Sequence, residues 1–183
     1  MQIVADTHVH LYDPYDPGAA LTRLCNNLAR LAALSEPKAP ILLAACLTER
    51  QDCNYFERLL ENPPKLEVLH IAPGNDASAI NVTGEYSLTL YAGSQIITAE
   101  RIEILALVCR ERISDGLSAS ETIAAIRQAG GVPVLPWSPG KWLGARGACV
   151  RNVIENAEPA SICVGDTAMR PVGFPEPRLF RAA

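Results

Sequence analysis

The sequence is short of several residue types, and each shortage narrows what the protein can be. It has only three histidines, two tryptophans and two methionines among 183 residues. It contains sixteen lysines and arginines but twenty aspartates and glutamates, and the resulting net charge of −4 argues against a general nucleic-acid-binding protein. No apolar run approaches the ~20 residues of a membrane-spanning helix, and the first residues lack the features of a secretory signal. We therefore expect neither membrane nor nucleic acid among its partners.

The six cysteines contain no Cys-x-x-Cys pair. Three of them, Cys46, Cys109 and Cys163, lie in apolar segments typical of strands. We interpret the cysteines as reduced residues of a core, because disulfide frameworks belong to oxidising compartments. This interpretation predicts a cytoplasmic protein.

Short apolar strands alternate with amphipathic helices along most of the chain. An apolar content of 49% and a charged content of 20% are those of an ordinary globular protein, and the length predicts one domain. Strands are expected at Gln2–Ala5, Ile41–Leu47, Arg101–Val108, Val132–Pro136 and Ile162–Gly165, and helices at about 21–32, 52–61, 118–129 and 148–157. Ser118 and Glu121 have the spacing of a capping box at the start of the third helix. Repeated strand–helix units favour parallel strands with right-handed crossovers.

The segment Leu66–Thr98 differs from the rest, because four short β-prone runs are separated by turn residues such as Ala92-Gly93-Ser94. This segment predicts an antiparallel meander at about 66–98 that is inserted into, or extends, an α/β fold, namely a distorted TIM-like (β/α) barrel. The barrel is expected to be incomplete, because such barrels take ~200 residues or more and residues 177–183 resemble the start of a helix with nothing after it. An unpaired edge on the first strand would favour a homo-oligomer.

The sharpest motif is Asp6-Thr7-His8-Val9-His10, at the end of the first strand. Side chains alternate along a strand, so Asp6, His8 and His10 are expected on one side. Two neutral imidazoles there can hold a divalent metal such as Zn, Mn or Fe. The C-terminal end of a barrel strand is also where active sites of such barrels lie. The alternative is a pair of ordinary polar residues at a strand end.

The D-x-H-x-H pattern resembles the start of polymerase and histidinol phosphatase (PHP) domains, and the wider amidohydrolase superfamily opens with a similar H-x-H. Residues 92–137, which include Ala129-Gly130-Gly131 and the strand after it, resemble a PHP domain in the order of their motifs. The resemblance implies a single PHP-like domain over residues 1–183, a PHP-type barrel and metal-dependent phosphoesterase activity.

The chain departs from the PHP pattern at several metal ligands. Gln95 stands where PHP domains have a metal-binding glutamate, Glu103 where they have a histidine, and Trp137-Ser138-Pro139 where they have His-Pro. The late Asp-x-His is absent. The family's three-metal site is therefore incomplete, and the ligand set that remains is His8, His10 and Glu103.

A glycine-rich loop, Pro136–Gly147, follows a strand and leads into a helix, which is a natural setting for an anion. Lys141 would supply a point charge, and Arg146 would contact two oxygens of a phosphate. The alternative is a connecting loop whose basic side chains are solvated and whose tryptophans pack.

Three further acidic residues and one histidine have two interpretations each. Asp166 follows another strand, where it would act as a general base or ligate a metal, or else form a turn before Pro171. Asp13 and Asp16 would approach the metal or cap the first helix. His70 would be a ligand or a packed strand residue, and its position in a β-prone run is more typical of the packed residue.

These observations predict a metal-dependent hydrolase of a small anionic substrate, with a phosphoester favoured. His8, His10 and Glu103 would hold the metal, Asp166 and Lys141 would be catalytic, and Lys141 and Arg146 would bind substrate. The alternative is a non-catalytic PHP-like barrel that acts as a binding or assembly module.

Overall fold

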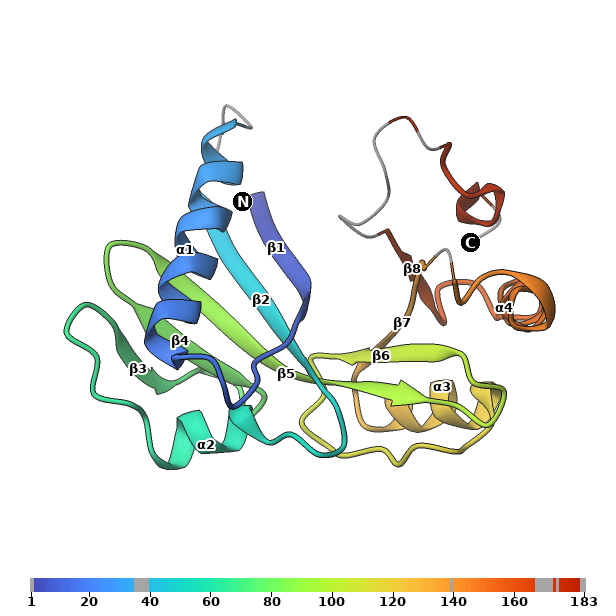
Figure 1. Cartoon of the computed structure of the whole chain (residues 1–183), viewed down its shortest axis with the longest axis horizontal. Coiled ribbons are helices and arrows are strands. Elements are labelled where there is room, and N and C mark those ends of the chain that lie inside the picture. The colour runs from blue at the N-terminus through green and yellow to red at the C-terminus, as the bar shows by residue number, and fades with distance from the viewer. Residues whose placement is uncertain (1, 35–39, 139, 167–172, 174, 182–183) are drawn as a thin grey trace. The chain divides into compact units, whose positions relative to one another are not determined.

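A computed structural model describes residues 2–34, 40–138, 140–166, 173 and 175–181 (Figure 1). The chain packs as two compact units, Met1–Gly93 and Ser94–Ala183. The elements are β1 (Gln2–Val9), α1 (Pro17–Leu34), β2 (Ile41–Glu49), α2 (Tyr55–Glu61), β3 (His70–Pro73), β4 (Ala79–Thr83), β5 (Ser87–Ile97), β6 (Glu103–Leu107), α3 (Ala119–Gln128), β7 (Val132–Pro136), α4 (Gly144–Glu155), β8 (Cys163–Gly165) and a short 3-10 helix (Arg178–Arg181).

The strands do not form the predicted TIM-like barrel of PHP type. Their hydrogen-bonded order is β1-β2-β5-β6-β7-β8, with β4 beside β5 and β3 beside β4. The pairs β1–β2 and β7–β8 are parallel, whereas β3–β4, β4–β5 and β6–β7 are antiparallel. Over the described ranges this order ends at β1 and β8, which do not pair with each other. The barrel prediction is therefore wrong, and the fold is a mixed α/β fold.

The reversal at β7 has a local cause in the second unit. After β6, the loop 108–118 returns to the end of β5, where the Gly116 N–H donates to the Ile97 carbonyl at 2.9 Å and the Ala99 N–H donates to Leu117 at 2.8 Å. Helix α3 therefore starts beside the beginning of β6 and runs along it. The chain then turns through Gly130-Gly131, and β7 comes back antiparallel to β6.

The antiparallel meander predicted for residues 66–98 is confirmed for β3, β4 and β5, but the turn predicted at residues 92–94 is wrong. Ala92, Gly93 and Ser94 were expected to form a turn, but all three are buried inside the continuous strand β5. Since β5 hydrogen-bonds with β2, β4 and β6, it is an interior strand of the sheet and not part of an insertion.

In the first unit, the sequence explains where the helices begin. Pro17 opens α1, and the Asp16 carboxylate accepts a hydrogen bond from the Ala19 N–H at 2.6 Å, so Asp16 caps this helix. The buried side of α1, which includes Leu21, Cys25 and Leu28, belongs to a core shared with β2, α2, β4 and β5. Helix α2 starts at Tyr55, later than predicted, because the buried Glu49 carboxylate accepts the N–H groups of Tyr55 and Phe56.

In the second unit, the predicted capping box of α3 is confirmed. The Ser118 side chain accepts the Glu121 N–H, and the Glu121 carboxylate accepts the Ser118 N–H. Helix α4 starts at Gly144, four residues before the predicted position. The core of this unit joins α3 and α4 to the strands through Ile96, Ile102, Ile104, Ile126, Leu135, Val150 and Ile154.

The six cysteines are free thiols. Cys25, Cys46 and Cys109 are buried, but Cys163 is exposed, which corrects its placement in the core. Its strand, β8, is only three residues long and ends the order of strands, so it has a neighbour on one edge. Over the described ranges, no helix combines the length and apolarity needed to cross a bilayer.

Candidate functional site

The two histidines of the H-x-H motif lie together in the first unit. His8 is exposed within β1, and His10 follows directly after that strand. Their ring centroids are 4.9 Å apart in an edge-on arrangement, and Tyr12 stacks on His10 with centroids 5.7 Å apart. The prediction that both imidazoles occupy the same side of the strand end agrees with this short distance.

The carboxylates near this pair serve other partners. Asp6 accepts the N–H of His8 at 3.0 Å, and Asp16 caps α1. Asp13 accepts hydrogen bonds from the Arg58 guanidinium and the Tyr55 hydroxyl, both at 2.8 Å. The hydrogen bond from Arg58, followed by that from Tyr55, lowers the pKa of Asp13 below its usual value. Of the two interpretations of Asp13 and Asp16, helix capping therefore holds for Asp16, and Asp13 forms an ion pair.

A complete set of metal ligands does not gather in the part of the chain that the structure describes. There, no group of three or more His, Cys, Asp or Glu side chains is arranged to hold a metal ion. His8 and His10 belong to the first unit, and Glu103 belongs to the second. A catalytic zinc normally has three protein ligands, so the donors that the structure shows together fall short of such a site.

Glu103 instead forms an ion pair with Lys141 in the second unit. Glu103 begins β6, and its side chain is only 6% exposed, whereas that of Lys141 is 37% exposed. The Lys141 ammonium donates to the Glu103 carboxylate. The pair neutralises both charges that the sequence analysis assigned to the site, because Glu103 was the predicted metal ligand and Lys141 the predicted phosphate-binding residue.

The rest of the glycine-rich loop is held by contacts to its own backbone and to nearby rings. The Trp142 indole N–H donates to the Pro136 carbonyl at 3.1 Å, and the Trp142 ring meets Phe180 edge-on at 5.9 Å. Arg146 donates to the Gly140 carbonyl at 2.8 Å. Asp166 is exposed directly after β8. The alternative of a packed connecting loop describes these contacts well, although Arg146 and Asp166 remain accessible to a ligand.

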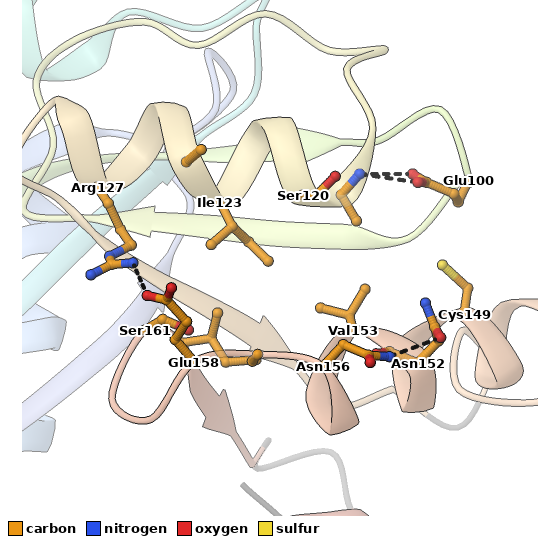
Figure 2. Close-up of a pocket in the computed structure, with 14 residues that line it drawn as sticks. Glu100, Ser120, Ile123, Arg127, Cys149, Asn152, Val153, Asn156, Glu158 and Ser161 are labelled. Atoms are coloured by element: carbon orange, nitrogen blue, oxygen red, sulfur yellow. Dashed lines mark hydrogen bonds and ion pairs between the residues drawn. The ribbon is translucent and has the colours of Figure 1, made fainter.

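A groove lies between α3 and α4, entirely within the second unit (Figure 2). It has a volume of about 460 Å³. Figure 2 shows Ile123 of α3 and Val153 of α4 pointing into the space between the helices, with Glu100 at one end and Arg127 at the other. Its walls also include Ala119, Ser120, Ala124, Cys149, Asn152, Asn156, Ala157, Glu158, Ser161 and Ile162.

Polar groups at the two ends of the groove are held in place. At one end, the Ala119 N–H lies 3.0 and 3.1 Å from the two Glu100 carboxylate oxygens. At the other end, Arg127 lies 3.6 Å from Glu158. On the α4 side, the Asn156 amide donates to the Asn152 side-chain oxygen at 3.0 Å. The groove therefore combines an apolar middle with polar ends, and the Arg127–Glu158 ion pair at one end is exposed to solvent.

Comparisons with known proteins assign no family to the chain. No protein-family model matches it, and no curated protein matches it. The crystal structure of PsfC from Pseudomonas syringae PB-5123 is similar to it, with 22% sequence identity and a TM-score of 0.44. This similarity covers 74% of the chain and 56% of PsfC, so the chain spans just over half of that protein's length. The resemblance to PHP domains stays a prediction.

The sequence analysis did not identify the groove. Its lining comes from both helices and from Glu100, Glu158 and Ser161 in the loops, and the amphipathic pattern of each helix says only which side is buried. A usable signal was the presence of small residues in and beside the two helices, because small side chains leave space between neighbouring elements; these are Ala119 and Ala124 of α3 and Ala157, which follows α4.

Proposed function

We propose that the chain is a non-catalytic binding module that holds a small molecule in the groove between α3 and α4. The groove itself carries this proposal. Small-molecule sites commonly have volumes of roughly 300–1,000 Å³, an apolar lining and a few polar groups that orient the ligand. The groove, with about 460 Å³ and charged groups at both ends, has these properties.

The engagement of residues predicted for the hydrolase site supports the same proposal. Glu103, predicted as a metal ligand, and Lys141, predicted to bind phosphate, neutralise each other, and Asp13 pairs with Arg58. Glu103 and Lys141 would first have to leave their ion pair to serve in catalysis. A binding module needs no such rearrangement, because its contacts come from side chains already placed along the groove.

Filling the groove tests this proposal. We expect Ala124→Trp to weaken binding of a neutral probe, phenethyl alcohol, at least about tenfold, because the indole would occupy the space between the helices. Ala148→Trp is the matched control, because Ala148 is exposed on α4 and does not line the groove. Dissociation constants from NMR titration provide the measurement. Equal affinity in the two variants would show that the probe binds elsewhere.

A metal-dependent hydrolase of a small anionic substrate is the second candidate, and the 4.9 Å separation of the His8 and His10 rings favours it. These imidazoles would hold the metal, which would lower the pKa of a bound water. Asp166, Lys141 and Arg146 would serve as the acid–base and phosphate-binding groups that the sequence predicts. The third protein ligand that this chemistry needs does not lie with the histidines in the described ranges.

Elemental analysis after soaking in Zn or Mn separates the two candidates. For a binding module, we expect no metal above the buffer level in the parent protein. For the hydrolase, the parent would bind metal, and His8→Ala would lower the affinity at least about tenfold. His70→Ala is the control, because His70 lies in β3, away from the H-x-H motif in the sequence. Metal that His8→Ala loses and His70→Ala keeps would overturn the non-catalytic proposal.

A further inference from the structure

We propose that the groove between α3 and α4 selects a ligand that carries a protonated amine on an apolar body, with the amine beside Glu100. This inference rests on the proposed binding function and adds the chemical class of the ligand. It follows from the distribution of charge along the groove, from the way Glu100 is held and from the state of the neighbouring thiol.

The charges along the groove are unbalanced. Of the lining residues that the structure describes, three are charged, namely Glu100, Arg127 and Glu158. Arg127 and Glu158 form an ion pair at one end, with their nitrogen and oxygen atoms 3.6 Å apart. Figure 2 shows Glu100 at the other end, beyond Ser120 and above Cys149. The groove therefore has one negative charge in excess, and it lies at the Glu100 end.

The Glu100 carboxylate is a fixed and permanent charge. Both of its oxygens lie within 3.1 Å of the Ala119 N–H, at the beginning of α3. Partial burial alone would raise the pKa of Glu100, but hydrogen bonds to the carboxylate, including that from Ala119, outweigh burial and lower the pKa. The positive end of the helix dipole is equivalent to only about half a charge, so the surroundings of Glu100 remain negative.

Cys149, on the α4 side of the same end, carries no charge of its own. Burial raises the pKa of its thiol, and the charge of Glu100 raises it further. The thiol is therefore neutral at pH 7, and it offers a small, polarisable surface beside the carboxylate. An ammonium group at this end would meet Glu100 and polar neighbours, whereas a carboxylate would meet an uncompensated negative charge.

The middle of the groove determines the rest of the ligand. Ile123, Ala124 and Val153 present hydrocarbon, which favours an apolar body next to the amine. Among the described residues of the lining, the counter-charge for a ligand anion is Arg127, where Glu158 already competes for it. A cationic, partly apolar molecule is therefore the best match for the whole groove.

Three probes that share one phenyl body test the inference: phenethylamine, phenethyl alcohol and hydrocinnamate, which are cationic, neutral and anionic at pH 7. We expect phenethylamine to bind about three- to fivefold more tightly than phenethyl alcohol, as for a solvent-accessible ion pair, and hydrocinnamate to bind most weakly. The preference should shrink as salt is raised, because salt screens accessible charges. NMR titration of each probe gives the dissociation constants.

Glu100→Gln should remove the preference for the amine over the alcohol. Glu155→Gln is the matched control, because it removes the same charge from an exposed position on α4 outside the groove, and it should keep the preference. Circular dichroism confirms folding, and the salt dependence in the parent keeps the test valid if Glu100→Gln is unfolded. Equal binding of amine and alcohol by the parent overturns this inference but leaves the binding function standing. No binding by any probe overturns both.

Discussion

Replacing Lys141 with methionine is expected to lower the free energy of unfolding by about 2–4 kcal/mol. The substitution removes the ammonium that donates to the Glu103 carboxylate, whose side chain is only 6% exposed. Breaking a buried ion pair by removing one partner is among the costliest single changes in a folded protein. We do not expect the largest losses of stability that follow the breaking of a buried ion pair, because water reaches Lys141, whose side chain is 37% exposed. Urea unfolding followed by tryptophan fluorescence measures the effect, since Trp137 and Trp142 flank the lysine.

Matched variants separate the ion pair from a general effect of removing a lysine. Lys65→Met removes the same charge from an exposed position and should change stability by less than about 0.5 kcal/mol. Glu103→Gln should cost less than Lys141→Met, because the partly exposed ammonium can be solvated. The double variant should lose about 1–3 kcal/mol less stability than the sum of the losses in the two single variants. If Lys141→Met unfolds at the same urea concentration as Lys65→Met, the ion pair contributes nothing to folding.

This ion pair also illustrates why the sequence did not predict the site. Glu103 and Lys141 are 38 positions apart, and no local pattern links them. Each residue alone has the chemistry of a functional group, as a metal ligand and as a phosphate-binding cation. Only the pairing of β6 with β7 brings the loop after β7 to the start of β6. The same argument applies to Asp13, whose partners Tyr55 and Arg58 come from a helix about 40 residues later.

Local features were predicted well, because they depend on neighbouring residues. The strand Val132–Pro136 has the predicted bounds, and the capping box of Ser118 and Glu121 is present. Strand direction was not predictable in this way. The antiparallel course of β7 follows from the hydrogen bonds of Gly116 and Leu117 to the end of β5, which no periodicity reveals. The error in fold class began there, since every strand–helix–strand unit was expected to be parallel.

Small residues misled the sequence analysis at two places, because residues expected in a turn or a loop belong to a strand or a helix. Ala92, Gly93 and Ser94 resemble a turn but form the interior of β5, where they are buried. Gly144 and Gly147 were expected in a loop before the fourth helix, yet both belong to α4. Glycine indicates where a backbone can bend or where another group approaches closely. The sequence alone does not distinguish these two meanings.

Gly147→Ala is expected to destabilise the protein by about 1–3 kcal/mol, although helix propensity predicts the opposite sign. In an unobstructed helix interior, alanine is about 1 kcal/mol more favourable than glycine. In α4, however, a Cβ at residue 147 would overlap the Trp142 carbonyl oxygen and lie 2.7 Å from its carbon. These are backbone atoms, so no side-chain rotation relieves the overlap. The Trp142 indole is itself bound to the Pro136 carbonyl, which resists a shift of the loop.

Gly140→Ala is the matched control, because it makes the same substitution in the same loop. A Cβ there meets no heavy atom within 4 Å, so stability should stay within about 0.5 kcal/mol of the parent. Urea unfolding by tryptophan fluorescence compares the two variants directly, and the Trp142 emission should also change in Gly147→Ala because the clash moves that residue. A Gly147→Ala protein more stable than Gly140→Ala would show that helix propensity outweighs the contact. Because Trp142 follows Lys141 directly in the sequence, the clash in Gly147→Ala would also shift the part of the loop that carries Lys141.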